Sequence, residues 1–220
     1  MRSITGTITD DGMIRQAVRA KLTLAHAGQD AVIVDELKVS RGSSRIDVAV
    51  VNGHIEGYEI KSDKDTLDRL PRQVRMFGLI ADRMTLVVGE RHLADSASLI
   101  PEWWSILVPS PKANGSLKLS VARRGRLNRS RDVLAMVEVL ERNEILAMMA
   151  AQGLDKGLRS ASYGELSRIA ATRLPLSTIS HMVKRLLKVR AALDARFADS
   201  SFGRNAIICS GPSVSDVGLP

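Results

Sequence analysis

The sequence predicts an α/β protein: a mixed β-sheet core flanked by helices, followed by a small all-α C-terminal module. Three observations indicate this class. Short runs of branched apolar residues alternate with helical patterns in the first half of the chain. The dipeptide Asn52–Gly53 separates two such runs and is a strong hairpin signal. Beyond residue 131 the apolar residues recur at helical spacing.

The first half of the chain accounts for the sheet. Acidic residues at 10 and 11 precede an amphipathic pattern, which predicts a helix over 12–27. A second helical stripe predicts a helix over 65–80, where Pro71 marks a helix start or a kink. We expect a sheet of four or five strands, and the candidate runs are 31–39, 45–51, 54–61, 84–90, 105–110 and, at the edge, 117–121.

The second half reads as helical and basic. Arginines crowd residues 123–131, and helices are expected over 131–151, 163–173 and 177–192. From residue 199 onward Ser, Gly and Pro accumulate without periodicity, which is typical of a mobile tail. The chain is therefore divided into a core (1–122), a basic linker with a helical module (123–194) and a flexible tail (195–220).

Composition narrows the function. The 220 residues carry a net charge of +8. Residues 1–110 hold 14 basic against 15 acidic side chains, whereas residues 111–220 hold 18 against 9. A positive second half predicts a polyanionic partner, with nucleic acid the common case, although an arginine-rich solvated surface is the alternative. A lone Cys209 excludes an internal disulfide, and the absence of a long apolar run predicts a cytoplasmic protein without a membrane partner.

Charged residues interrupt the two apolar strands of the predicted hairpin. Glu59 and Lys61 are two residues apart, so they share one face of their strand. Whether Asp47 joins them depends on the register. A two-residue turn would place Asp47 opposite Tyr58, whereas a three-residue loop would place it opposite Glu59.

If the register brings Asp47 and Glu59 together, their mutual repulsion calls for a cation. Carboxylate oxygens, a main-chain carbonyl and waters are ligands that Mg²⁺ or Mn²⁺ accepts. Lys61 beside them would stabilise developing negative charge or orient an attacking water. Glu36 on the preceding strand is a candidate third carboxylate. The alternative is an exposed sheet face with ordinary surface ion pairs.

These residues resemble a known signature. The succession Glu36, Arg45–Ile46–Asp47, Tyr58–Glu59–Ile60–Lys61 and Gln73 with Phe77 is similar to the active-site motif of the PD-(D/E)XK nuclease superfamily. The extension through Ser62, Asp63 and Asp65 to Arg69, the Trp103–Trp104 pair and the helical tail resemble a family of small bacterial proteins within it. The likeness covers residues 12–194 and implies a restriction-endonuclease-like core.

The resemblance also implies roles. Asp47 and Glu59 would bind the catalytic Mg²⁺ or Mn²⁺ together with the Ile60 carbonyl, and Glu36 would be the upstream acidic ligand. Lys61 would act on the attacking water or the scissile phosphate, and Gln73 would support the site from its helix. Two positions depart from the pattern: Ile46 replaces the proline before the aspartate, and Phe77 replaces a tyrosine.

Residues 164–190 resemble a helix-turn-helix, which offers one surface for DNA. In that interpretation Lys184, Arg185 and Lys188 meet phosphates, with Arg123 and Arg124 in the linker. The alternative interpretations are a solvated amphipathic helix, and DNA held around the core by Arg45, Arg69 and Arg72.

The combined hypothesis is a divalent-metal-dependent deoxyribonuclease that cuts within DNA, in repair, defence or mobile-element processing. The rival hypothesis is a non-catalytic DNA-binding protein that uses the basic helical module beside a degenerate nuclease core. Whether the chain forms a homodimer is left open by the sequence.

Overall fold

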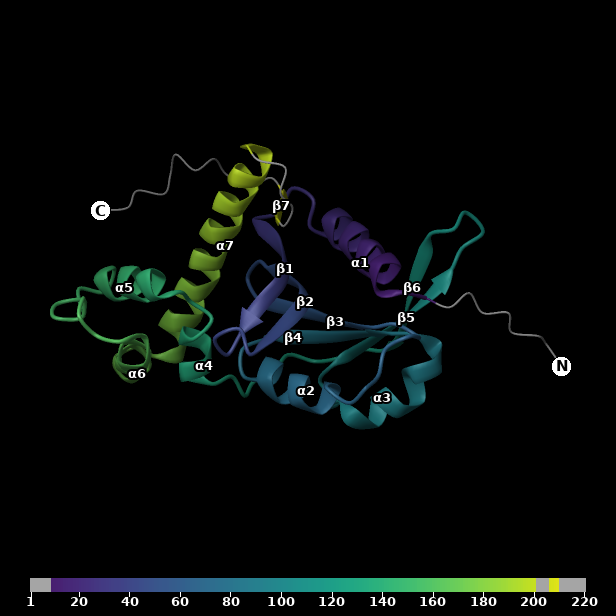
Figure 1. Cartoon of the computed structure of the whole chain (residues 1–220), viewed down its shortest axis with the longest axis horizontal. Coiled ribbons are helices and arrows are strands. Elements are labelled where there is room, and N and C mark those ends of the chain that lie inside the picture. The colour runs from purple at the N-terminus through teal and green to yellow at the C-terminus, as the bar shows by residue number, and fades with distance from the viewer. Residues whose placement is uncertain (1–8, 201–205, 210–220) are drawn as a thin grey trace.

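The fold is a mixed sheet with helices on both faces. The computed structural model describes residues 9–200 and 206–209. Its seven-stranded sheet has the order β6-β5-β4-β3-β2-β1-β7, with helices above and below it (Figure 1). The predicted α/β class with a C-terminal helical region is therefore confirmed, and the sheet is wider than the four or five strands expected.

The strands follow the predicted runs closely. Strands β1, β2 and β3 form an antiparallel meander, β3, β4 and β5 run parallel, and β6 and β7 pair antiparallel at the two edges. The bounds are β1 Ala31–Val39, β2 Ser44–Val51, β3 Ile55–Lys61, β4 Arg83–Val88, β5 Ser105–Pro111, β6 Leu117–Arg123 and β7 Ala206–Cys209.

Helix α1 (Asp11–Ala25) covers one face of the sheet. It begins at Asp10, whose side chain accepts a hydrogen bond from the Met13 N–H as an N-cap. Its buried stripe Ile14, Val18 and Leu22 packs on apolar side chains of β1, β2, β3, β4, β5 and β6. This burial places the flank of its first turns, which carries Arg15 and Arg19, next to the β1–β2 pair.

The other face is covered by α2 (Leu70–Gly78), η1 (Glu90–His92), α3 (Leu93–Leu99) and the C-terminal helices. Helix α2 begins five residues later than predicted, because Pro71 occupies its first turn, where a missing N–H costs nothing. Helix α3 was not predicted at all. Its seven residues are too few to show a helical stripe.

The C-terminal helices are α4 (Val133–Val137), α5 (Arg142–Ala150), α6 (Tyr163–Arg173) and α7 (Leu176–Ser200). The single helix predicted over 131–151 is wrong, because the chain ends α4 at Glu138 and begins α5 with a capping box between Glu141 and Glu144. Buried residues of α4, α5, α6 and α7 belong to the same hydrophobic cluster as those of α2 and the sheet.

The structure describes only part of the predicted aperiodic tail. Helix α7 continues through residues 195–200, and residues 206–209 form β7 against β1, so these segments are regular. The remaining residues of the predicted tail lie outside the described part of the chain. Within that part, no helix has the length and apolarity needed to cross a lipid bilayer.

Candidate active site

The β2–β3 hairpin has the register that brings Asp47 to Glu59. Val51 pairs with Ile55 across a three-residue loop, and the ladder continues to Val48 opposite Tyr58. The strands then separate. The Ile60 N–H donates to Asp47 Oδ2 at 2.7 Å instead of to a main-chain carbonyl of β2. Asp47 therefore lies in the gap between the two strands and completes the hydrogen bonding of β3.

Strands β1 and β2 kink together at this point. Ile33 and Leu37 are an even number of residues apart yet pack on opposite faces of the sheet, and so do Ile46 and Val48. The alternation thus slips at Glu36 and at Asp47. These two residues lie across from each other, where the β1–β2 pairing is interrupted between the pairs Asp35–Val48 and Leu37–Ile46. Glu36 adopts φ 53°, a left-handed conformation that is costly for a residue with a side chain. Strain of this kind is typical of functional sites.

Glu59 and Lys61 are held on the α2 side of β3. Both are buried, and Lys61 Nζ donates to Glu59 Oε1 at 2.6 Å. Gln73 on α2 donates from Nε2 to the same oxygen. Parallel pairing of β3 with β4, from Glu56 opposite Arg83 to Lys61 opposite Val88, holds these residues on a rigid strand. Four residues chosen from the sequence (Asp47, Glu59, Lys61 and Gln73) are therefore neighbours.

Burial changes the proton affinity of the acids. Desolvation first, and then the charge of Asp47, raise the pKa of Glu59 from 4.5 to about 8, although Lys61 and Gln73 act in the opposite direction. Partial burial and Asp47 likewise raise the pKa of Glu36, against the effect of Arg15 and Arg45. The site thus disfavours several negative charges at once, and either protonation of an acid or a nearby cation relieves the repulsion.

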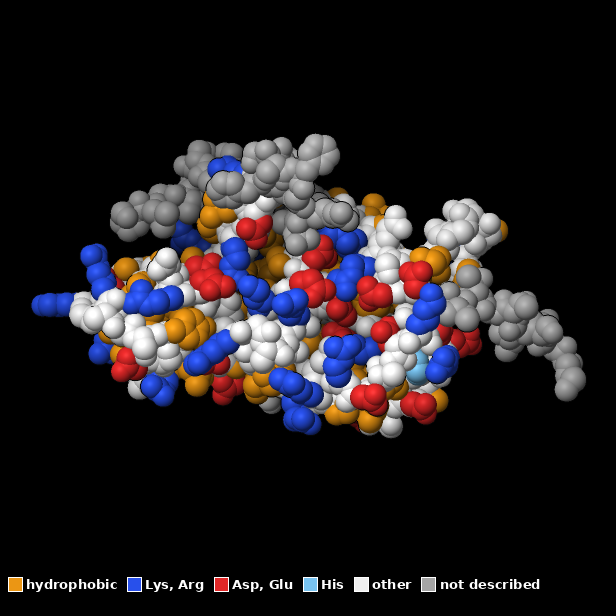
Figure 2. All heavy atoms as spheres, viewed as in Figure 1, with side chains coloured by type: hydrophobic (Ala, Val, Ile, Leu, Met, Phe, Trp, Pro, Cys, Tyr) orange, Lys and Arg blue, Asp and Glu red, His pale blue; other side chains and the backbone are white. Residues whose placement is uncertain are grey.

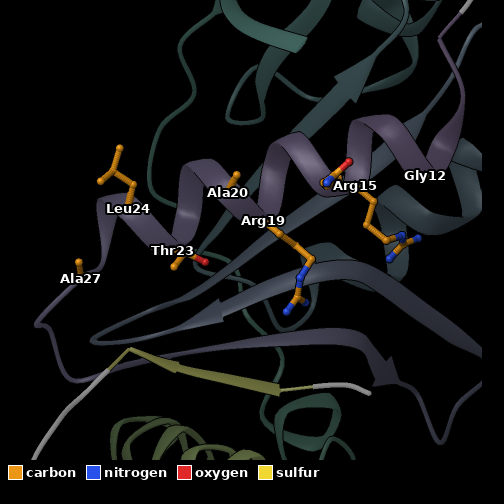
Figure 3. Close-up of a pocket in the computed structure, with 8 residues that line it drawn as sticks. Gly12, Arg15, Arg19, Ala20, Thr23, Leu24 and Ala27 are labelled. Atoms are coloured by element: carbon orange, nitrogen blue, oxygen red, sulfur yellow. The ribbon is translucent and has the colours of Figure 1, made fainter. Parts of the chain in front are cut away.

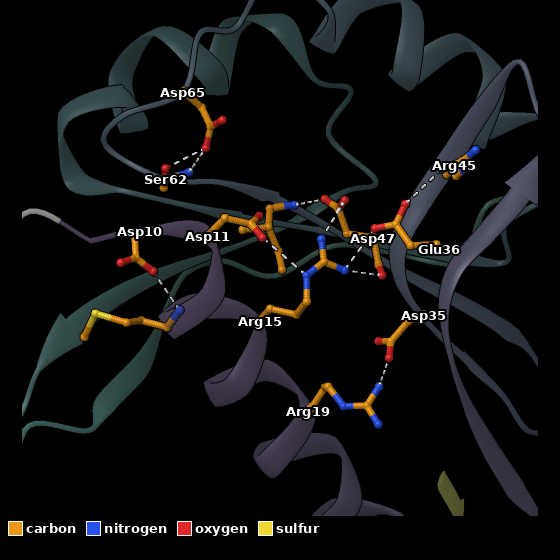
Figure 4. A network of polar contacts seen from close by, with 12 residues as sticks. Asp10, Asp11, Arg15, Arg19, Asp35, Glu36, Arg45, Asp47, Ser62 and Asp65 are labelled. Atoms are coloured by element: carbon orange, nitrogen blue, oxygen red, sulfur yellow. Dashed lines mark hydrogen bonds and ion pairs between the residues drawn. The ribbon is translucent and has the colours of Figure 1, made fainter. Parts of the chain in front are cut away.

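Arg15 on α1 supplies such a cation, and sequence reasoning missed it. Its guanidinium donates to the Asp47 main-chain oxygen at 2.7 Å and lies 3.2 Å from both Asp47 Oδ1 and Glu36 Oε1 (Figure 4). Burial acts to lower the pKa of Arg15, but Asp47, Asp11 and Glu36 outweigh it, so the pKa is raised. The available signal was its position on the polar side of the predicted helix, adjacent to the apolar stripe.

The residues around Asp47 and Glu59 have the chemistry that a magnesium or manganese ion requires. Glu59 Oε2 and Gln73 Oε1 are buried and have no hydrogen-bond partner, because both donors to Glu59 fall on Oε1. The carbonyl of Ile60 points to the same strand edge as its N–H, and therefore toward Asp47. Residues 9–200 and 206–209 contain no convergent group of three His, Cys, Asp or Glu side chains. Two carboxylates with waters suffice for Mg²⁺.

An open cavity of about 400 Å³ gives access to these groups. It is lined by the acids Glu36, Asp47 and Glu59, by Ile60, Lys61 and Gln73, and at its rim by three exposed arginines, Arg45, Arg69 and Arg72. Every residue assigned from the sequence to catalysis, metal binding or core DNA contact thus borders one cavity. Their roles remain predictions.

The Ser62–Asp65 extension of the motif shapes the chain next to the cavity. Asp65 Oδ2 accepts hydrogen bonds from the Ser62 N–H at 2.7 Å and from its hydroxyl at 2.6 Å, which closes a turn directly after Lys61. Asp63 accepts two hydrogen bonds from Thr9. Burial opposes their effect, yet these contacts lower the pKa of Asp63. The acids of this extension therefore hold the end of β3 in place.

The predicted basic contacts of the C-terminal region divide into two kinds. Lys184 Nζ donates to the Gly53 main-chain oxygen at 2.9 Å, and Lys188 Nζ pairs with Asp30 Oδ2 at 2.7 Å, so both tie α7 to the sheet. Arg123 donates to the main-chain oxygens of Pro101 and Trp104. Arg124 and Arg185 are exposed.

Other exposed cations were not singled out from the sequence. On the face seen in Figure 2, Lys and Arg side chains gather at the end of the molecule formed by α5 and α6. Exposed members in α6 and the segment before it are Lys156, Arg159, Arg168 and Arg173. Their spacing follows no motif, so only the excess of positive charge in this half of the chain indicated such a surface.

Fold and site together define an α/β protein with a carboxylate–lysine cluster where a hairpin splays in a mixed sheet. The sequence profile of the family described as bacteriophage P4 protein cII matches residues 10–206. The chain therefore belongs to the bacteriophage P4 cII family.

Sequence comparison finds a relative, protein cII of Enterobacteria phage P4. It is 24% identical over 161 residues, which cover 73% of this chain and 60% of the relative. The chain thus spans less than two thirds of the length of the phage protein. No solved structure matches the chain significantly. Neither the family description nor the name of the relative states an activity.

Proposed function

We propose that this protein is a divalent-metal-dependent deoxyribonuclease of the PD-(D/E)XK type that cuts within DNA strands. The observation that carries the proposal is the buried, unpartnered Glu59 Oε2 beside Asp47 and Lys61 in an open cavity. A buried acceptor without a donor is rare in folded proteins and costs stability. A metal ion bound to this oxygen would give it a partner and offset that cost.

The chain's own residues divide the work. Asp47 and Glu59 would hold Mg²⁺ or Mn²⁺ with the Ile60 carbonyl. Gln73 would orient the Glu59 carboxylate through its hydrogen bond to Glu59 Oε1. When bound, the ion supplies a more acidic water and charge stabilisation at the phosphate. Lys61 Nζ offers a proton donor and a positive charge for the pentacoordinate phosphorus intermediate or transition state. Arg45, Arg69 and Arg72 at the rim would bind flanking phosphates.

The family membership bears on the biological setting. The relative is a phage protein, which favours mobile-element processing over general repair or defence among the three settings open from the sequence.

A plasmid assay tests the proposal. Purified protein with Mg²⁺ or Mn²⁺ is expected to nick or linearise closed circular DNA, which only internal cutting achieves, and EDTA should abolish the reaction. Asp47→Asn and Glu59→Gln should each remove activity. Asp35→Asn is the matched control, because Asp35 is a β1 carboxylate that pairs with Arg19 and does not line the cavity. Cleavage that survives in the Asp47 and Glu59 variants contradicts the proposed site.

A second candidate function is DNA binding without catalysis. It is favoured by the ion pairs of Lys61 with Glu59 and of Arg15 with Asp47, which balance the acids without a metal. This alternative predicts a DNA complex that forms equally in EDTA and in Mg²⁺, with no cleavage by the wild-type protein.

A further inference from the structure

Arg15 occupies the carboxylate oxygens that a metal ion would need. Its guanidinium bridges Asp47 Oδ1 and Glu36 Oε1, at 3.2 Å from each (Figure 4). These two acids lie opposite each other on kinked strands, so the planar fork of the arginine spans the gap between them. The side chain comes from α1, on the other face of the sheet from Lys61 and Gln73.

The contacts of Asp47 leave little room for a second cation. Oδ2 is engaged by the Ile60 N–H at 2.7 Å, which holds the strand end, and Oδ1 is engaged by Arg15. A divalent ion on Oδ1 would lie within a few ångströms of the guanidinium, where like charges repel strongly in a partly buried site. Arg15 and the metal therefore claim the same oxygen.

We infer that Arg15 is the resident counter-cation of the site and that it competes with the divalent metal for Asp47 and Glu36. The inference rests on the proposed function, because it requires that the site binds a metal. The structure offers Arg15 another partner if a metal ion displaces it from Asp47. Arg15 Nε lies 3.3 Å from Asp11 Oδ2, one turn earlier on the same helix, so the guanidinium keeps a partner after it leaves Asp47.

The same helix provides a matched control. Arg19 lies one turn after Arg15 and extends from the same side of α1 toward the strands (Figure 3). It pairs with Asp35, which does not line the cavity. Arg15→Gln and Arg19→Gln thus each remove one half-buried arginine that pairs with the sheet. Arg15 pairs with two carboxylates and Arg19 with one, and only the first substitution acts on the proposed ligands.

The experiment measures Mn²⁺ binding directly, by electron paramagnetic resonance of free Mn²⁺ or by calorimetry, on the full chain. Arg15→Gln should bind Mn²⁺ at least about tenfold more tightly than the wild type, because one repelling charge is removed. Arg19→Gln should bind within about twofold of the wild type. In EDTA both variants should have a lower Tm, and saturating Mn²⁺ should raise the Tm of Arg15→Gln by the larger amount.

The outcomes separate this inference from the proposed function. Equal or weaker Mn²⁺ binding by Arg15→Gln, with binding by the wild type intact, overturns the competition and makes Arg15 a positioning residue for the ligands. Absence of Mn²⁺ binding in the wild type and in both variants overturns the proposed metal site as well. If Arg15→Gln does not fold, Arg15→Lys serves instead. It keeps the charge without the bridging fork, so an increase in affinity smaller than tenfold is expected, and no increase refutes the inference.

Discussion

The buried acid Glu59 makes the stability of the metal-free protein depend on pH. Its pKa is raised from 4.5 to about 8, first by burial and then by Asp47. The folded protein therefore keeps a proton on Glu59 at pH values where the unfolded chain has lost it. Rising pH favours unfolding, and the contribution of Glu59 present below pH 4.5 is lost as the pH passes through about 8.

The magnitude follows from the two pKa values. A difference of this size corresponds to about 5 kcal/mol in total, at 1.36 kcal/mol for each pKa unit. Between about pH 5.5 and about pH 8, linkage gives a loss of about 3 kcal/mol in the free energy of unfolding. Glu59→Gln cannot ionise, so this part of the pH dependence should vanish in the variant.

Urea denaturation followed by circular dichroism, in EDTA at several pH values, measures both proteins. The quantity to compare is the change in unfolding free energy between the two pH values, wild type against Glu59→Gln, which cancels the titration of groups that do not interact with Glu59. The same pH dependence in both proteins would refute the argument, since Glu59 would then titrate as an exposed acid. Saturating Mn²⁺ should flatten the wild-type profile, because metal binding requires the ionised carboxylate.

Two further predictions concern the linker and the basic surface. Gly125→Ala should destabilise the protein by about 1–3 kcal/mol in urea denaturation, because the added Cβ would lie 2.3 Å from the Trp103 oxygen and 2.6 Å from the Ser105 nitrogen, both main-chain atoms. Gly53→Ala, with open space around it, should change stability by less than about 0.5 kcal/mol, and equal effects would contradict this packing. If the basic C-terminal surface holds DNA, charge removal at its exposed cations should flatten the slope of log affinity against log salt by about 0.9 for each phosphate that the variant no longer neutralises. The cations to change are Lys156, Arg159, Arg168 and Arg173. Lys184→Gln with Lys188→Gln breaks the contacts between α7 and the sheet. This double variant should lower the Tm and change the salt slope little. An unchanged slope in the first set assigns DNA binding to the arginines at the cavity rim.

The sequence alone determined most elements of the fold, because their signals are local. Runs of branched apolar residues mark the strands, Asn52–Gly53 marks the hairpin, and the amphipathic pattern after Asp10 and Asp11 marks α1. Charged residues inside apolar strands drew attention to Asp47, Glu59 and Lys61, and the resemblance to the nuclease signature added Gln73. Where local signals were weak, prediction failed. The break between α4 and α5 depends on capping at Glu141, and α3 is too short to show periodicity.

Only the tertiary structure decided whether a site exists. The register of Val51 opposite Ile55 is set by packing on both faces of the sheet, and a slip of one residue would have moved Asp47 away from Glu59. The joint kink at Glu36 and Asp47 and the approach of Arg15 from α1 involve residues up to 32 positions apart. Interactions at such separation depend on how whole elements pack, which spacing along one chain does not encode. For the same reason Lys184 and Lys188, which look free for DNA in the sequence, are bound to the sheet in the folded protein.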